Sequence, residues 1–148
     1  MSRSAEIRLF LAQVVNWAKV DPNILGVVLV GSYARGEAGP ESDVDLVIIT
    51  ETPAALLANT EWTGAFGEAL ESTSEDWGKV QSVRVRYETG PEIEFGITGR
   101  DWLSEPLDSG TAGVLRDGAE ILFERVDYVS ARFQRFSIPH TRRDIERC

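Results

Sequence analysis

Cysteine and histidine are nearly missing from this chain of 148 residues, which has one of each, Cys148 and His140. A single cysteine forms neither an internal disulfide nor a thiolate metal cluster. Long apolar runs are missing as well, because residues 27–30 with their flanks fall far short of the roughly 20 apolar residues that span a bilayer. Residues 1–8 are too polar for a signal peptide, so we expect a cytoplasmic protein without a membrane segment.

Basic residues are scarce, since 15 Lys and Arg stand against 24 Asp and Glu and give a net charge of −9. Binding to a nucleic-acid backbone needs many cations facing the polymer, so this charge argues against long nucleic acid as the main ligand. A nucleotide is not excluded, because a metal ion or a cluster of backbone N–H groups can supply a local positive field. The 43% of apolar residues suffices for the core of one domain.

Hydrophobic spacing in the first third of the chain predicts a helix followed by two strands. Apolar residues recur at helical spacing from Ile7 to Ala18. After the breaker cluster at residues 21–23, the β-branched run at residues 24–30 suits a strand buried on both faces. Residues 44–50 form a second apolar run, and a short helical turn at residues 32–37 fits between the two strands.

The remainder of the chain predicts three more strands. Pro53 opens a helical stretch of about twenty residues. Residues 80–87 and 92–98 alternate apolar with polar side chains around a Gly-Pro turn, which indicates a hairpin, and residues 119–124 read as a last strand. We therefore expect an α+β domain over residues 1–130, followed by an arginine-rich tail at residues 131–148.

Two aspartates mark the start of the second strand. Asp43 and Asp45 are two residues apart, so their side chains leave one face of the strand with Cβ atoms roughly 6–7 Å apart. Two such charges repel by about 3 kcal/mol at 5 Å in an effective dielectric of 20. The pair therefore predicts a bound cation, and oxygen-only ligands favour Mg²⁺, which completes its coordination with waters and substrate phosphates.

The residues before these aspartates suit a phosphate. Gly31 allows close backbone approach at the end of a buried strand, and Ser32 offers a hydroxyl at the start of the helical turn. Arg35 projects from the same turn, either toward the phosphates or into solvent. Gly31 and Ser32 together with the two aspartates make four fixed positions, and such a set recurs by chance with a probability on the order of 10⁻³ in a chain of this length.

A third carboxylate would complete a two-metal site, in which one ion activates a hydroxyl and the other holds a triphosphate. Glu94 is the first choice because it lies between apolar residues, where an unpaired carboxylate is costly, whereas Glu92 lies beside a turn and is easily solvated. Arg84 and Arg86 lie on a strand face that could neighbour these carboxylates, although arginines on a half-exposed strand are usually solvated.

The stretch GSYARGEAGPESDVDL at residues 31–46 resembles the signature of the nucleotidyltransferase superfamily typified by DNA polymerase beta. The chain looks most like the minimal, single-domain members, because it lacks the C-terminal helical bundle that forms the acceptor site in antibiotic-modifying relatives. The resemblance implies a mixed sheet of about five strands covered by helices. One departure is a glutamate where many relatives have a third aspartate.

For the site, the resemblance implies that Gly31 and Ser32 hold a nucleoside triphosphate, with ATP among the candidates. It implies that Asp43, Asp45 and Glu94 hold two magnesium ions while a nucleoside monophosphate passes to a hydroxyl of a small molecule or a protein. The alternative is an antitoxin-like binding partner of a separate helical protein. The sequence leaves open the nucleotide, the acceptor, the role of the tail, and whether the chain acts alone, as a homodimer or with a partner.

Overall fold

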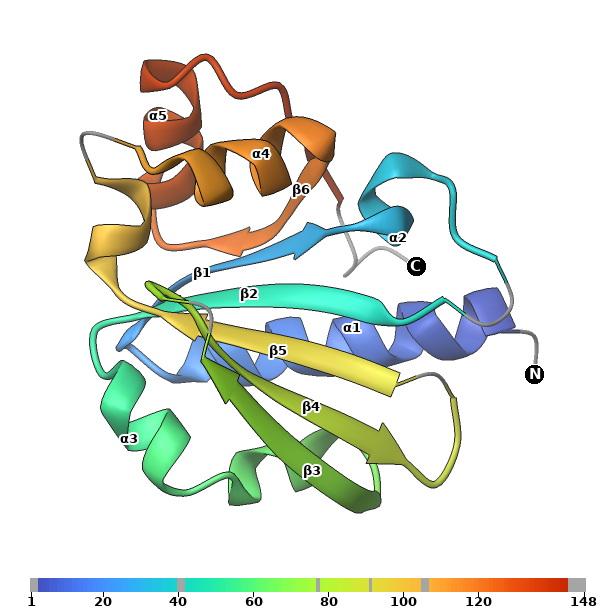
Figure 1. Ribbon diagram of the computed structural model, residues 1–148. Coiled ribbons are helices and arrows are strands. Elements are labelled where there is room, and N and C mark those ends of the chain that lie inside the picture. The colour runs from blue at the N-terminus through green and yellow to red at the C-terminus, as the bar shows by residue number, and fades with distance from the viewer. Residues whose placement is uncertain (1–2, 40–41, 77, 91, 105–106, 144–148) are drawn as a thin grey trace.

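The framework of the protein is one seven-stranded mixed sheet (Figure 1). The computed structural model describes residues 3–39, 42–76, 78–90, 92–104 and 107–143, so motif residues 40–41 and tail residues 144–148 lie outside the described residues. The strands are β1 (Ile24–Val30), β2 (Val44–Thr50), β3 (Ala69–Asp76), β4 (Gln81–Tyr87), β5 (Glu92–Thr98), β6 (Ala119–Glu124) and β7 (Thr141–Arg142). The helices are α1 (Arg3–Val20), α2 (Ser32–Arg35), α3 (Pro53–Ala58), η1 (Glu61–Phe66), η2 (Arg100–Leu103), α4 (Ser109–Asp117) and α5 (Tyr128–Arg135).

The strand order is β3-β4-β5-β2-β1-β6-β7. The pairs β2–β5 and β6–β7 are parallel, and the other four pairs are antiparallel. All five expected strands are present, and β4 and β5 form the expected hairpin. The expected α+β class with a mixed sheet is therefore confirmed, with seven strands in place of about five.

The two additional strands carry no apolar pattern that the sequence could reveal. All eight residues of β3 are exposed, so neither of its faces needs apolar side chains. This strand replaces the end of the helical stretch expected after Pro53, where the helical part ends with η1 at Phe66. The other strand, β7, is only two residues long and both are exposed.

Helices cover both faces of the sheet. Figure 1 shows α1 and α3 on one side of the strands and α4 and α5 on the other. The first core joins α1 and η1 to one face of β1, β2, β4 and β5, with Leu11, Leu46 and Phe95 at most 1% exposed. The second core joins η2, α4 and α5 to β1, β2 and β6 on the opposite face. Because β1 carries apolar residues toward both cores, all seven of its residues are buried.

The segment expected as a tail from residue 131 belongs to this fold as far as residue 143. The helix α5 runs through the expected boundary, and Phe133 and Ile138 are buried in the second core. Arg142 and Arg143 form ion pairs with Glu124 and Glu120 of β6. Buried apolar side chains and these two ion pairs therefore both hold this part of the segment against the sheet. None of the helices in the described part of the chain is long and apolar enough to cross a membrane.

Candidate active site

Three charged side chains form a row across the middle of the sheet. In the parallel pair β2–β5, Asp45 lies opposite Glu94, and in the antiparallel pair β4–β5, Arg84 lies opposite the same Glu94. Neighbouring residues of these strands, such as Phe95, point into the first core. Because side chains alternate along a strand, the three charged residues share the opposite face.

The guanidinium of Arg84 bridges the carboxylates around it. Its Nη1 donates to Asp43 Oδ2 at 2.6 Å, and its Nη2 donates to Glu94 Oε2 at 2.8 Å. A longer contact of 3.4 Å joins Nη1 to Glu92 Oε2. The hydrogen bond to Asp43 is the main cause that raises the pKa of Arg84 above its usual value. The cluster therefore contains a fixed cation that offsets the repulsion among its acids.

Gly31 is required by its contact with Asp45. Its φ is +75° and ψ is −157°, a combination that is essentially confined to glycine. A Cβ at this position would lie only 2.4 Å from Asp45 Oδ2. The carbonyl of Gly31 accepts hydrogen bonds from the N–H groups of Ala34 and Arg35, at 3.1 and 3.2 Å, and so starts α2. The glycine thus lets the start of α2 press directly against the carboxylate.

Asp45 is the acid of the cluster with the strongest perturbation. Its pKa is raised from 3.8 to about 6, first by burial and then by the neighbouring negative charges of Glu94 and Asp43, against a smaller lowering by Arg84. Arg84 forms short hydrogen bonds with Asp43 and Glu94, so its charge is directed mainly at those two acids. Burial and the neighbouring acids therefore disfavour the ionised form of Asp45, and a further cation beside it would stabilise that form.

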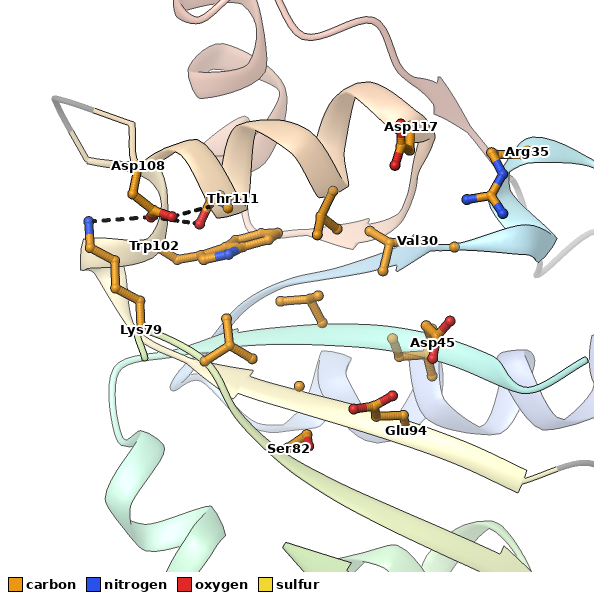
Figure 2. A pocket seen from close by; sticks show the side chains of 17 residues that line it. Val30, Arg35, Asp45, Lys79, Ser82, Glu94, Trp102, Asp108, Thr111 and Asp117 are labelled. Carbon is orange, nitrogen blue, oxygen red and sulfur yellow. Dashed lines mark hydrogen bonds and ion pairs between the residues drawn. The ribbon is translucent and has the colours of Figure 1, made fainter. Parts of the chain in front are cut away.

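A pocket of about 520 Å³ opens beside this cluster. Figure 2 shows Asp45 and Glu94 at one end of it, with Arg35 above Asp45. Its lining also contains apolar side chains, among them Val47, Val80 and Val114. A volume of this size is typical of sites for small organic ligands.

The other end of the pocket is closed by η2, α4 and the residues before β4. Trp102, 2% exposed, lies along the pocket between sheet and helix (Figure 2). Asp108 accepts hydrogen bonds from the N–H and the hydroxyl of Thr111, at 2.9 and 2.7 Å, and these bonds lower its pKa. Lys79 Nζ lies 3.8 Å from Asp108 Oδ2 and donates to the carbonyl of Asp101 at 3.1 Å. The pocket thus has two polar ends and apolar side chains in its lining.

The structure brings most of the expected site residues together. Gly31, Arg35, Asp45 and Glu94 line the one pocket. Asp43 lies just before β2 and joins the cluster through Arg84. The remaining expected residue, Ser32, is the first residue of α2 and is not part of the pocket lining described above.

Sequence reasoning gave too little weight to Arg84. The alternation of β4 placed it on the correct face, but only the hairpin register shows that it lies opposite Glu94. Trp102 is buried, and it also walls the pocket. Lys79 and Asp108 lie in irregular segments, where no periodic pattern indicates what they contact.

The donor set of the cluster suits a hard cation, because its possible ligands are carboxylate oxygens alone. Within the described ranges, no three His, Cys, Asp or Glu side chains are arranged so as to hold a metal ion. Asp43 and Glu94 converge instead on one guanidinium, which shows that both reach a common positive charge. The carboxylates therefore fit a divalent ion by their chemistry, although two of them, Asp43 and Glu94, form ion pairs with Arg84.

Comparison with known protein families decides the relationship of this chain. A model of the family described as the nucleotidyltransferase domain matches residues 12–102, which is more than half of the chain. The chain belongs to this family. The match includes Gly31, Asp43, Asp45, Arg84 and Glu94. Comparison with curated protein sequences finds no match.

Comparison with solved structures shows the same fold in one protein. An aminoglycoside 6-adenyltransferase from Bacillus subtilis is similar with a TM-score of 0.50 and 16% identity, over 69% of this chain and 36% of that one. Cid1 in complex with a UTP analogue gives a TM-score of 0.45 and 18% identity, over 64% and 30% of the two chains. The chain thus spans about a third of the length of these proteins.

The contact between Gly31 and Asp45 predicts that Gly31→Ala is far more damaging than Gly36→Ala. Gly36 has a φ of +72° but no neighbouring atom within 4 Å of an added Cβ, so alanine there costs only about 1–2 kcal/mol of backbone strain. At Gly31 the strain is joined by a clash, because an added Cβ would lie only 2.4 Å from Asp45 Oδ2. Urea unfolding of both variants measures the difference, and equal losses would contradict the contact.

The raised pKa of Asp45 predicts that Asp45→Asn stabilises the protein at pH 7.5 and not at pH 3.5. Between pH 3.8 and about 6 the unfolded chain ionises first, so the native state holds the extra proton and loses stability as the pH rises. Above that window the penalty, at most about 3 kcal/mol, is complete, and asparagine removes it. Urea unfolding at both pH values tests this. A gain of the same size at both would show that ionisation is not its cause.

Proposed function

We propose that the protein is a Mg²⁺-dependent nucleotidyltransferase that moves a nucleoside monophosphate from a nucleoside triphosphate to a hydroxyl of a small molecule or a protein. The observation that carries the proposal is the gathering of Asp43, Asp45 and Glu94 on one sheet face beside Gly31, at one end of a pocket. Membership of the nucleotidyltransferase domain family supports it.

Each residue has a role that follows from its position. Asp43, Asp45 and Glu94 would hold up to two ions, and bound magnesium would lower the pKa of the acceptor hydroxyl and neutralise the triphosphate. Gly31 leaves room for phosphate oxygens beside Asp45, because it has no side chain. Ser32 and Arg35 lie on α2 next to it and would donate hydrogen bonds to the phosphates.

The pocket would hold the organic part of the substrates. Its apolar lining buries carbon surface, and Lys79 and Asp108 at the far end offer one donor and one acceptor. The matched part of this chain covers only 36% of the adenyltransferase and 30% of Cid1, so their acceptors and nucleotides are not carried over. An antitoxin-like partner of a helical protein would need no cluster of three acids, so the site favours chemistry. The cytoplasmic location remains a prediction.

The direct test is mass spectrometry of candidate acceptors, including protein that co-purifies with the chain, after incubation with each nucleoside triphosphate and Mg²⁺. We expect a mass increase of one nucleoside monophosphate on an acceptor with wild-type protein and none with Asp45→Asn. Binding of nucleotide without transfer to any acceptor would favour the alternative of a regulatory partner.

The site also predicts that Mg²⁺ and nucleotide stabilise the protein cooperatively. Each alone should bind weakly, since magnesium rarely finds all its ligands on a protein and the nucleotide meets like charge. Together they should raise the melting temperature by more than the sum of the separate shifts, and saturation at a hundredfold excess over Kd is worth about 2.7 kcal/mol. Thermal unfolding with a non-hydrolysable triphosphate measures this. Simple additivity in the wild type would contradict a shared metal–triphosphate site.

The third carboxylate can be assigned by comparing Glu94→Gln with Glu92→Gln. Glu94 is 21% exposed and faces Asp45, whereas Glu92 is 41% exposed and only touches Arg84 at 3.4 Å. Losing a direct ligand should lower the transfer rate by more than the roughly 10–100-fold typical of outer partners, while Glu92→Gln should cost less than about tenfold. A kinetic assay measures both losses. A larger loss of rate in Glu92→Gln than in Glu94→Gln would assign Glu92 as the third ligand in place of Glu94.

A further inference from the structure

Arg84 lies where an incoming cation would have to bind. Its two terminal nitrogens are each committed to a different acid, one to Asp43 at 2.6 Å and the other to Glu94 at 2.8 Å. Both acids belong to the set that would hold magnesium under the proposed function. The guanidinium and a metal ion therefore compete for the same two carboxylates.

This competition is strong by simple electrostatics. A magnesium ion binds carboxylate oxygens at about 2.0–2.1 Å, and a carboxylate whose charge already serves a short, charge-assisted hydrogen bond to a guanidinium is a weaker ligand for it. A guanidinium held beside the ion would also repel it. An ion that binds Asp43 and Glu94 together therefore competes with Arg84 for the negative charge of both carboxylates.

We propose that Arg84 is a built-in competitor that closes the carboxylate cluster to a free divalent ion and yields it to an ion that arrives with a nucleotide. The proposal rests on the proposed function. The nucleotide changes the balance in two ways: its phosphates supply the ligands that the protein lacks, and they give the released guanidinium a new anion to bind. Arg84 on β4 would thus make binding of the metal ion depend on binding of the nucleotide.

Arg84 has the freedom that this role requires. Its side chain is 30% exposed, and β4 lies between β5 and the fully exposed edge strand β3. Glu92 lies 3.4 Å from Nη1, so a guanidinium that leaves Asp43 and Glu94 still has a carboxylate beside it. Release therefore does not leave an isolated charge in the sheet.

The experiment measures the affinity of the full chain for Mn²⁺ or Mg²⁺ in the absence of nucleotide by isothermal titration calorimetry. Wild type is compared with Arg84→Gln. The matched control is Arg86→Gln, which removes the same charge from the same face of β4. Arg86 pairs with Glu71 of β3 at 3.3 Å, outside the acid cluster. The control thus separates a specific competition from the general effect of removing a positive charge.

We expect Arg84→Gln to bind the free metal ion at least tenfold more tightly than wild type, and Arg86→Gln to change the affinity less than threefold. The ion-free Arg84→Gln protein should melt at a lower temperature than wild type, and metal alone should restore the loss. Arg84→Lys keeps one charge but replaces the planar fork of the guanidinium with a single ammonium, so it should lie between them and serves if Arg84→Gln fails to fold.

Two results would overturn the proposal, and they differ in what they say of the function. If Arg84→Gln and Arg84→Lys bind the free ion like wild type while Asp45→Asn abolishes metal–nucleotide binding, the metal site stands and Arg84 does not compete for it. If no variant and no wild-type sample binds metal even with nucleotide present, the proposed function fails as well.

Discussion

Acids on adjacent strands of one sheet face need a positive charge among them, and this requirement governs the structure of the site. Asp45 and Glu94 are direct neighbours in a parallel register, and Asp43 lies two residues before Asp45. Their mutual repulsion is comparable to a large share of the 5–15 kcal/mol that stabilises a typical domain. Arg84 supplies the offsetting charge for Asp43 and Glu94, while Asp45 keeps a raised pKa. The native sheet therefore tolerates an arrangement whose full neutralisation needs a ligand.

The hydrophobic core on the opposite face of the sheet fixes the positions of these acids, although none of the three acids is part of that core. Leu46 on β2 and Phe95 on β5 lie opposite each other and are buried beneath α1 and η1. A slip of one residue in either strand would turn its carboxylate into that core and its apolar residues into the pocket. The burial that stabilises the fold is thus also what holds Asp45 against Glu94. Precision at the site is a consequence of packing on the opposite face.

The sequence predicts those parts of the site that depend on local patterns. Spacing by two places Asp43 and Asp45 on one face, and the alternation in β5 separates Glu94 from its apolar neighbours. The role of Arg84 could not be predicted in the same way. It depends on the register between β4 and β5, which decides whether the guanidinium lies beside a carboxylate or in solvent. The strand β3 was missed for a related reason, since a strand exposed on both faces needs no apolar alternation.

The pocket separates two kinds of binding energy along its length. At one end the acids and Arg35 face charge, and interactions there depend strongly on the ionic state of both partners. The apolar part of the lining, which includes Val47, Val80 and Val114, offers surface whose contribution scales with the area buried and hardly depends on charge. Under the proposed function, exchange of the guanidinium for a metal ion would control whether transfer occurs, and the apolar walls with Lys79 and Asp108 would control which molecule is chosen. Substitutions at the two ends should therefore affect rate and substrate preference separately, since the two ends share no side chain.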